Sequence, residues 1–160
     1  MTQPKYVSKN FKAYLIHEVN KSTVLLIRSI IPYFFGSTPA DFDQAIDIHP
    51  FSPCPGSPNC AIHSVEFSEN SQELFEMVRS SMNRISPYKV EFNSHSLQID
   101  AVFRIPVFGF KDDVQIIIKP MDSERSILYI KSASRIGRSD LGVNRRRIKR
   151  ILSVTHQQIS

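Results

Sequence analysis

The sequence has no tryptophan, only five glycines and only two cysteines among its 160 residues. So little glycine excludes a collagen-like chain. The apolar and charged fractions, 41% and 22%, are those of a globular protein rather than a coiled coil or a disordered chain. A chain of this length buries about 70% of its unfolded surface, so one domain can fold without disulfides or metals.

No uninterrupted apolar run is long enough to cross a membrane. The most apolar stretch, residues 23–35, would span roughly 20 Å as a helix, and it contains Arg28 and Pro32. We therefore expect no transmembrane helix. Residues 1–36 form a basic and apolar leader, expected to be helical, that is either an atypical secretory signal or an interfacial helix. A helix packed on the domain, or a partly disordered arm, is the alternative.

The formal net charge of +5 is unevenly distributed along the chain. Residues 1–28 carry five basic side chains and one acidic side chain, residues 29–134 carry eight basic and thirteen acidic, and residues 135–160 carry seven basic and one acidic. An acidic body between two basic ends is unusual for a protein whose whole surface binds nucleic acid. Each basic end therefore needs its own explanation.

The patterns after a Pro-containing linker, residues 37–50, are those of a single α+β domain, residues 51–160. Alternating apolar residues predict strands around 65–67, 88–92, 97–103, 114–119 and 128–131. Helical spacing predicts one helix capped by Asn70 or Ser71 and ended by Pro87, and a final helix capped by Ser139 or Asp140. The final apolar stripe contains Leu141, Ile148, Ile151, Leu152, Thr155 and Ile159.

Short turns between successive strands favour antiparallel pairing. We predict an antiparallel sheet of four to five strands in the order β-α-β-β-β-β-α, with two amphipathic helices on one face. We expect a monomer.

The two cysteines lie close together in the segment CPGSPNC, residues 54–60. Their even count and close spacing fit a disulfide in an exported protein, whereas two thiols or half a metal site would be commoner in the cytosol. His49 and His63 would complete a zinc set with Cys54 and Cys60. That spacing matches no common zinc finger, so we predict no metal site, and no motif indicates a cofactor.

An acidic pair, Asp112 and Asp113, lies in the segment GFKDD just before a predicted strand. Two carboxylates can bind a divalent cation or divide acid and base roles. Adjacent residues of a strand point to opposite faces, however, so turn chemistry or ion pairs with arginines are the favoured interpretation.

The richest segment is SASRIGRSDLGVNRRRIKR, residues 132–150, which runs from a strand into the final helix. Arg135 and Arg138 precede a helix N-terminus, where free amides attract a phosphate or carboxylate. The anion could equally be internal, with Asp140 as the cap and Asp112 or Asp113 as partners of the arginines. The binding candidates are Ser132, Ser134, Arg135, Arg138, Asn144, Arg145, Arg146, Lys149 and Arg150.

Four of these residues, Arg145, Arg146, Lys149 and Arg150, are expected on the helix face opposite the apolar stripe. Such a ridge suits anionic lipid or an acidic partner, and a solvated helix face is the alternative. Binding to nucleic acid is disfavoured because no interleaved aromatic residues and no known DNA- or RNA-binding pattern accompany the ridge.

The segments CPGSPNC, GFKDDV and SASRIGRSDLGVNRRRI together resemble the uncharacterised bacterial and plastid family known as domain of unknown function 1499, over residues 50–152. This chain has Ala61, Ile62 and His63 where the family usually has Val-Ser-Ser, and Gln115 where it usually has Glu. The family implies no activity or cofactor. Many members look like lipoproteins or membrane-tethered proteins, which favours an envelope location and, with it, the disulfide. The first forty residues contain no cysteine for a lipid anchor.

Three functional hypotheses follow. The first is a non-enzymatic binding module, membrane-associated or exported, whose Arg-rich strand-to-helix corner engages an anionic group. The second is a hydrolase-like enzyme in which five polar residues meet in one cleft: Asp112, Asp113, Arg135, Asp140 and Asn144. Its catalytic candidates are the three aspartates. The third is binding of nucleic acid through the final helix.

Overall fold

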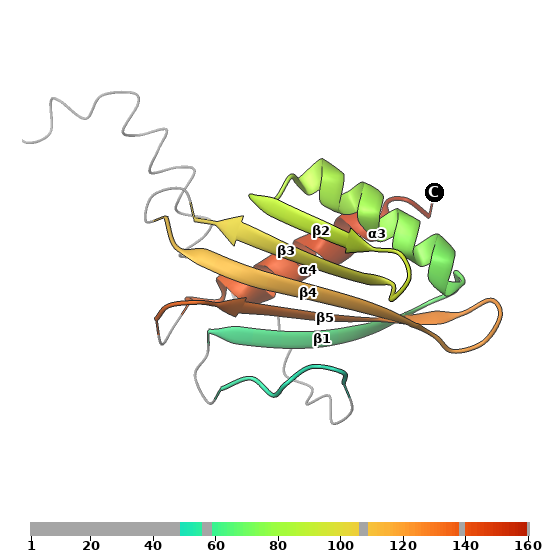
Figure 1. Cartoon of the computed structure of the whole chain (residues 1–160), viewed down its shortest axis with the longest axis horizontal. Helices are drawn as coiled ribbons and strands as arrows, with labels where there is room; N and C mark the ends of the chain where they lie inside the picture. Colours follow the sequence, from blue (N-terminus) through green and yellow to red (C-terminus); the bar gives the residue numbers. More distant parts are fainter. Residues whose placement is uncertain (1–48, 56–58, 106–108, 138–139, 160) are drawn as a thin grey trace, which may run out of the picture.

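The computed structural model describes residues 49–55, 59–105, 109–137 and 140–159, so the predicted leader lies outside the described residues. The described chain contains five strands and two helices (Figure 1). The strands are β1 (Cys60–Phe67), β2 (Lys89–Asn93), β3 (Gln98–Arg104), β4 (Lys111–Pro120) and β5 (Ser126–Ser134). They form one antiparallel sheet in the order β1-β5-β4-β3-β2.

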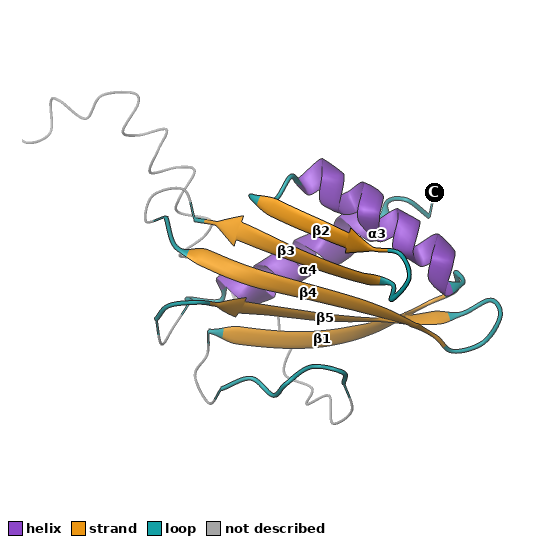
Figure 2. Cartoon of the chain, in the orientation of Figure 1, coloured by secondary structure: helices purple, strands orange, loops and turns teal. Residues whose placement is uncertain are grey.

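The helices are α3 (Ser71–Ile85) and α4 (Val143–His156). Figure 2 shows both of them packed against the sheet, and α3 carries the chain from one edge strand, β1, to the other, β2. The side chain of Asn70 accepts hydrogen bonds from the backbone N–H groups of Gln72 and Glu73, at 3.1 and 3.0 Å, which explains where α3 begins.

The core lies between the helices and one face of the sheet because buried and more exposed positions alternate along β2, β3, β4 and β5. Inward positions of β3, β4 and β5 are buried, as in Ile99, Ile116 and Ile130, while the residues between them face the opposite, polar side. The helices contribute Leu74, Phe75, Val78, Met82, Ile148, Ile151 and Leu152. One face of the sheet is therefore apolar and covered, and the other is wet.

The structure confirms the α+β class, the five-stranded antiparallel sheet and the predicted order of elements. The first strand is longer than predicted, because it begins at Cys60 and pairs along its whole length with β5. The final helix begins later, at Val143 after Gly142, so its N-cap residue is neither Ser139 nor Asp140, and that prediction was wrong. The Asp140 side chain nevertheless accepts a hydrogen bond from the Asn144 N–H in the first turn. No helix of the described residues is long and apolar enough to span a membrane.

Two members of the predicted final stripe are also wrong. Leu141 precedes the helix and is 54% exposed, and Ile159 follows it and is 50% exposed. The other four, from Ile148 to Thr155, are buried as predicted.

Antiparallel pairing gives the domain two distinct ends. The end where β3 and β5 finish and β1, β4 and α4 begin is called the pocket end below. The end with the β2–β3 and β4–β5 turns and the β1–α3 connection is called the hairpin end. In Figure 1 the pocket end is on the left and the hairpin end is on the right.

Candidate functional site

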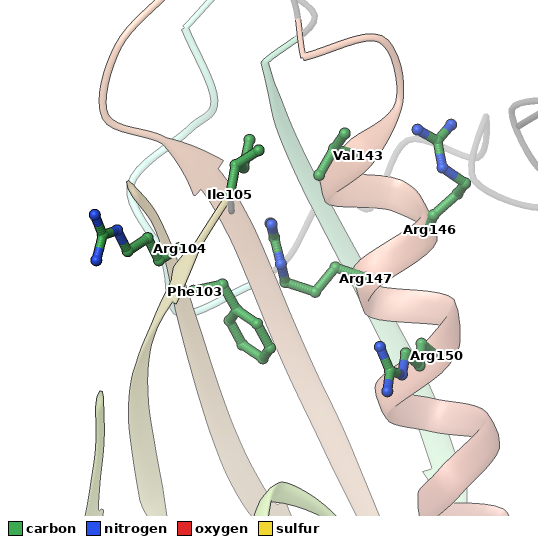
Figure 3. Close-up of a pocket in the computed structure, with 7 residues that line it drawn as sticks. All are labelled: Phe103, Arg104, Ile105, Val143, Arg146, Arg147 and Arg150. Carbon is green, nitrogen blue, oxygen red and sulfur yellow. The ribbon is translucent and has the colours of Figure 1, made fainter. Parts of the chain in front are cut away.

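A pocket opens at the pocket end of the domain, between β3 and the first turns of α4. Its volume is about 150 Å³, and Figure 3 shows the residues that line it: Phe103, Arg104, Ile105, Val143, Arg146, Arg147 and Arg150. The sheet side is apolar because Phe103 is an inward position of β3. The helix side is strongly basic.

Helical geometry explains the basic wall. Residues three and four apart lie on one face of a helix, so Val143, Arg146, Arg147 and Arg150 form one continuous surface toward the strands. Arg104 differs, because it is an outward position of β3 and its guanidinium is directed away from α4 (Figure 3). The arginines that can face a bound molecule are therefore those of α4.

Arg147 is the fixed member of this wall. Its side chain, 8% exposed, forms an ion pair with Asp112, which is 1% exposed, at 2.5 Å between Nη2 and Oδ2. Nη1 donates to Ser132 Oγ at 3.0 Å and to Asn144 Oδ1 at 2.8 Å. The guanidinium also lies 4.8 Å from the centre of the Phe103 ring, within the range of a cation–π interaction. These contacts hold one positive charge at the base of the pocket.

The buried amide of Asn144 connects this arginine to β1 and β5. Its Oδ1 accepts from Ser132 Oγ as well as from Arg147, and its Nδ2 donates to Ser134 Oγ and to the carbonyl of Asn59, both at 2.9 Å. Asn59 directly precedes Cys60, and its own Nδ2 donates to the Gly137 carbonyl at 2.6 Å. The disulfide segment, the end of β5 and α4 are thus joined through one amide.

Two further arginines line the pocket nearer to solvent. Arg146 donates from Nη1 to the Leu141 carbonyl at 3.0 Å. Burial lowers the pKa of Arg146, and the nearby Asp140 carboxylate acts in the opposite direction. Arg150 has no hydrogen bond or ion pair within the described residues, and its side chain is exposed.

The start of α4 already has its own anion. Asp140 Oδ1 accepts from the Gly142 N–H at 2.9 Å, and Oδ2 accepts from the Asn144 N–H at 2.7 Å. The Asp140 carboxylate therefore already binds the backbone amides that an external phosphate or carboxylate would otherwise bind. Asp140 serves the first turn of α4 even though it stands two residues before the cap.

The five polar residues of the hydrolase hypothesis do not meet in one cleft, so that prediction was wrong. Asp113 and Arg135 form an ion pair at 2.7 Å on the polar face of the sheet, where the carboxylate raises the pKa of Arg135. Asp112 and Asn144 lie on the opposite face, beneath α4. As expected from strand geometry, the adjacent aspartates point to opposite sides.

Cys54 and Cys60 form a disulfide, as the count and spacing of the cysteines favoured and the family resemblance supported. Both sulfurs are therefore committed to each other, and the zinc alternative with His49 and His63 is not formed. His49 Nδ1 instead accepts a hydrogen bond from the Phe51 N–H at 3.3 Å. No cluster of three or more potential ligands exists among the described residues.

The predicted basic ridge is divided in the structure. Arg146 and Arg150 face the pocket, whereas Arg145 and Lys149 are on a neighbouring surface of α4 and do not line it. Ser132 and Ser134 lie in the buried network, and Arg138 lies outside the described residues.

Sequence reasoning missed Arg147, Asn59 and the apolar wall. Arg147 stands four residues from both Val143 and Ile151, so helical spacing already placed it toward the core. Alternation placed Phe103 on the apolar face of its strand, but no sequence signal placed Phe103 or Ile105 beside α4, because that position depends on the strand order.

A family model described as "Protein of unknown function (DUF1499)" matches residues 36–154, most of the sequence. The chain belongs to this family. The match extends beyond the region of resemblance at both ends, and it includes every residue that lines the pocket described above. No curated protein matches the sequence.

Several solved structures are similar to the DUF1499 domain at low identity. One is the di-domain ARO/CYC StfQ from the steffimycin biosynthetic pathway, with 7% identity, a TM-score of 0.49, and coverage of 60% of this chain and 43% of that chain. A START superfamily protein from Mycobacterium smegmatis has 10% identity and a TM-score of 0.41, over 63% and 99% of the two chains.

The Zhui aromatase/cyclase from Streptomyces sp. R1128 has 12% identity and a TM-score of 0.44, over 63% and 95%. The chain spans less than half of the length of the two di-domain proteins that it matches, 43% in each case. At these identities and scores the likeness says nothing about a ligand or a reaction of this chain.

Proposed function

We propose that the DUF1499 domain is a non-enzymatic binding module, membrane-associated or exported, that holds the anionic group of an amphiphilic molecule in the arginine pocket. One observation carries the proposal: a cationic wall from α4 and an apolar wall from β3 face each other across one pocket. A molecule with a carboxylate or phosphate beside a hydrocarbon segment matches both walls.

The charge state of the pocket supports an anionic ligand. Asp112 neutralises Arg147, but Arg150 has no acidic partner among the described residues, and Arg146 is partly removed from water. A positive charge that has lost hydration gains most from an anion placed beside it. We therefore assign the anionic group to Arg146 and Arg150, with Arg147 as the fixed charge behind them.

The size of the pocket limits what it holds. Its volume of about 150 Å³ is well below the roughly 300–1,000 Å³ of pockets that enclose a drug-sized ligand. The pocket suits a head group and the first part of a chain, with the remainder outside. A pocket of this size suits a domain that captures or presents its ligand rather than one that encloses the ligand completely.

The disulfide supports the exported or membrane-associated setting. Disulfides persist in oxidising compartments and are rare in the cytosol, and the basic and apolar leader suits either a signal or an interfacial helix. The location of the protein in fractionated cells tests this part of the proposal directly.

Titration calorimetry with octanoate, octyl phosphate and octanol tests the pocket. We expect both anions to bind and octanol to bind at least about tenfold more weakly, since a charge-assisted hydrogen bond contributes about 1.5–3 kcal/mol. Arg150→Gln should weaken octyl phosphate binding by about tenfold. Lys149→Gln, on the same helix but outside the pocket, is the matched control.

Equal binding of octanol and octyl phosphate would contradict the proposal. So would an equal loss of affinity in Arg150→Gln and Lys149→Gln, because the effect would then come from net charge rather than from the pocket.

A further inference from the structure

The pocket end exposes most of the large apolar side chains that are exposed in the described residues. Phe110, in the β3–β4 loop, is 46% exposed, while Ile136 and Leu141, in the β5–α4 connection, are 66% and 54% exposed. Tyr88, at the start of β2, is 60% exposed. Figure 1 shows that these segments, although distant in sequence, lie at the same end of the sheet. Several exposed apolar side chains at one end of a domain are typical of an interaction surface.

Leu141 is held outward at a conformational cost. Its φ of +51° lies in the left-handed region, which glycine and asparagine adopt far more readily than leucine. Backbone strain of this kind concentrates at functional sites, and here it is combined with a side chain that is more than half exposed. The observation therefore points to a role for its side chain outside the domain.

The two ends of the domain differ in charge. The pocket end carries Arg104, Lys111, Arg135, Arg145 and Arg146 at its surface, with Asp113 and Asp140 as the acidic side chains. The hairpin end carries mostly acidic side chains: Glu66, Glu69, Glu73, Asp122 and Glu124, with Lys119 and Arg125 as the basic ones. Such a charge distribution orients a protein with its basic end toward an anionic surface.

We infer that the pocket end docks on the surface of an anionic lipid bilayer, with Ile136 and Leu141 entering the headgroup region and the basic side chains beside lipid phosphates. Basic groups near an anionic membrane are attracted to the lipid phosphates, and apolar side chains gain free energy by leaving water. The inference rests on the membrane-associated half of the proposed function. It identifies the bilayer as the surface toward which the arginine pocket opens.

The absence of tryptophan makes a direct test possible. In the full chain, Ile136→Trp and Met121→Trp each introduce a single tryptophan, at the pocket end and at the hairpin end, and Met121 is likewise exposed, at 42%. With phosphatidylglycerol vesicles we expect a blue shift and quenching by brominated lipid for Ile136→Trp alone. Phosphatidylcholine vesicles should produce neither change, and added salt should weaken both.

These reporters also separate the pocket end from the leader. If the protein binds vesicles while the Ile136→Trp spectrum stays unchanged, another segment makes the contact and the inference is wrong. An equal shift for Met121→Trp, or an equal response to neutral lipid, would overturn it as well.

Leu141→Asn supplies the second test. Asparagine tolerates the left-handed conformation, so the melting temperature should stay equal or rise, while vesicle affinity falls about tenfold. A marked drop in melting temperature would show that Leu141 serves the fold, and unchanged vesicle affinity would remove its membrane role.

The two proposals can fail separately. If octyl phosphate binding depends on Arg150 but Ile136→Trp does not respond to vesicles, the ligand pocket is supported and the docking surface is refuted. If Ile136→Trp responds to vesicles but neither octanoate nor octyl phosphate binds, the docking surface is supported and the ligand pocket is refuted.

Discussion

Arg147 and Asp112 are charged groups that the fold has taken almost completely out of water. Removing an ion from water costs several kcal/mol, and this pair recovers that cost through a short contact and the hydrogen bonds of Ser132 and Asn144. Asp112 Oδ1 is buried and has no hydrogen-bond partner among the described residues. The pair therefore fixes the position of the arginine more than it stabilises the domain.

Replacing one partner should accordingly cost more than replacing both. We expect Arg147→Met to lower the free energy of unfolding by about 3–5 kcal/mol, because it leaves the Asp112 carboxylate buried without its counter-ion. The double change Asp112→Leu with Arg147→Met should recover a large part of that loss. Urea unfolding of the four proteins in a double-mutant cycle measures the difference.

An additive result, with the double variant losing the sum of the two single changes, would show that the pair is not coupled. If the double variant recovers stability as expected, its octyl phosphate binding reports what Arg147 adds to the pocket.

At the scale of elements, what could be predicted depended on whether the signal was local. The alternation in β3, β4 and β5 and the cap at Asn70 belong to short segments, so the sequence sufficed to place them. The predicted start of α4 was too early because Leu141 has the helical spacing of the buried apolar residues of α4. Nothing in the local sequence shows that the backbone of Leu141 adopts a left-handed conformation.

The pocket itself needed the tertiary structure. Phe103 and Val143 are forty residues apart and meet only because β3 lies two strands from β5, which feeds α4. The charges alone predict that some arginines pair with internal aspartates. They do not predict which arginine pairs with which aspartate. Strand alternation decides that Asp113 meets Arg135 and Asp112 meets Arg147.

The disulfide ties residues 49–55 to the start of β1 and lies next to Asn59, which contacts α4 through Asn144. We expect the double change Cys54→Ser and Cys60→Ser to lower the free energy of unfolding by about 2 kcal/mol, since the closed loop is short. Urea unfolding measures this change. The mass of the native protein should rise by two hydrogens on reduction, and an unchanged mass with two alkylatable thiols would contradict the disulfide.

At the scale of the whole molecule, the formal charge of +5 is a poor summary of the surface. The described domain has a basic pocket end and an acidic hairpin end, and the basic residues of the final segment have three separate uses. Arg135 pairs across the polar face of the sheet, Arg147 pairs within the core, and Arg146 and Arg150 line the pocket. Electrostatic attraction to an anionic partner thus depends on orientation rather than on net charge.

The domain that carries these features should fold without the leader. Among the described residues, the hydrophobic core lies between Ala61 and Leu152, and the earliest described contact with the sheet is the hydrogen bond from Lys131 Nζ to the Ser52 carbonyl, 2.8 Å. A chain that begins at His49 should therefore melt within about 2 °C of the full chain, because it keeps every described core residue. Calorimetry of both chains measures this, and Ile136→Trp in the shorter chain should still respond to phosphatidylglycerol vesicles. A clearly lower melting temperature would mean that residues 1–48 pack on the domain, which was the alternative for the leader, and would place the domain boundary before residue 49.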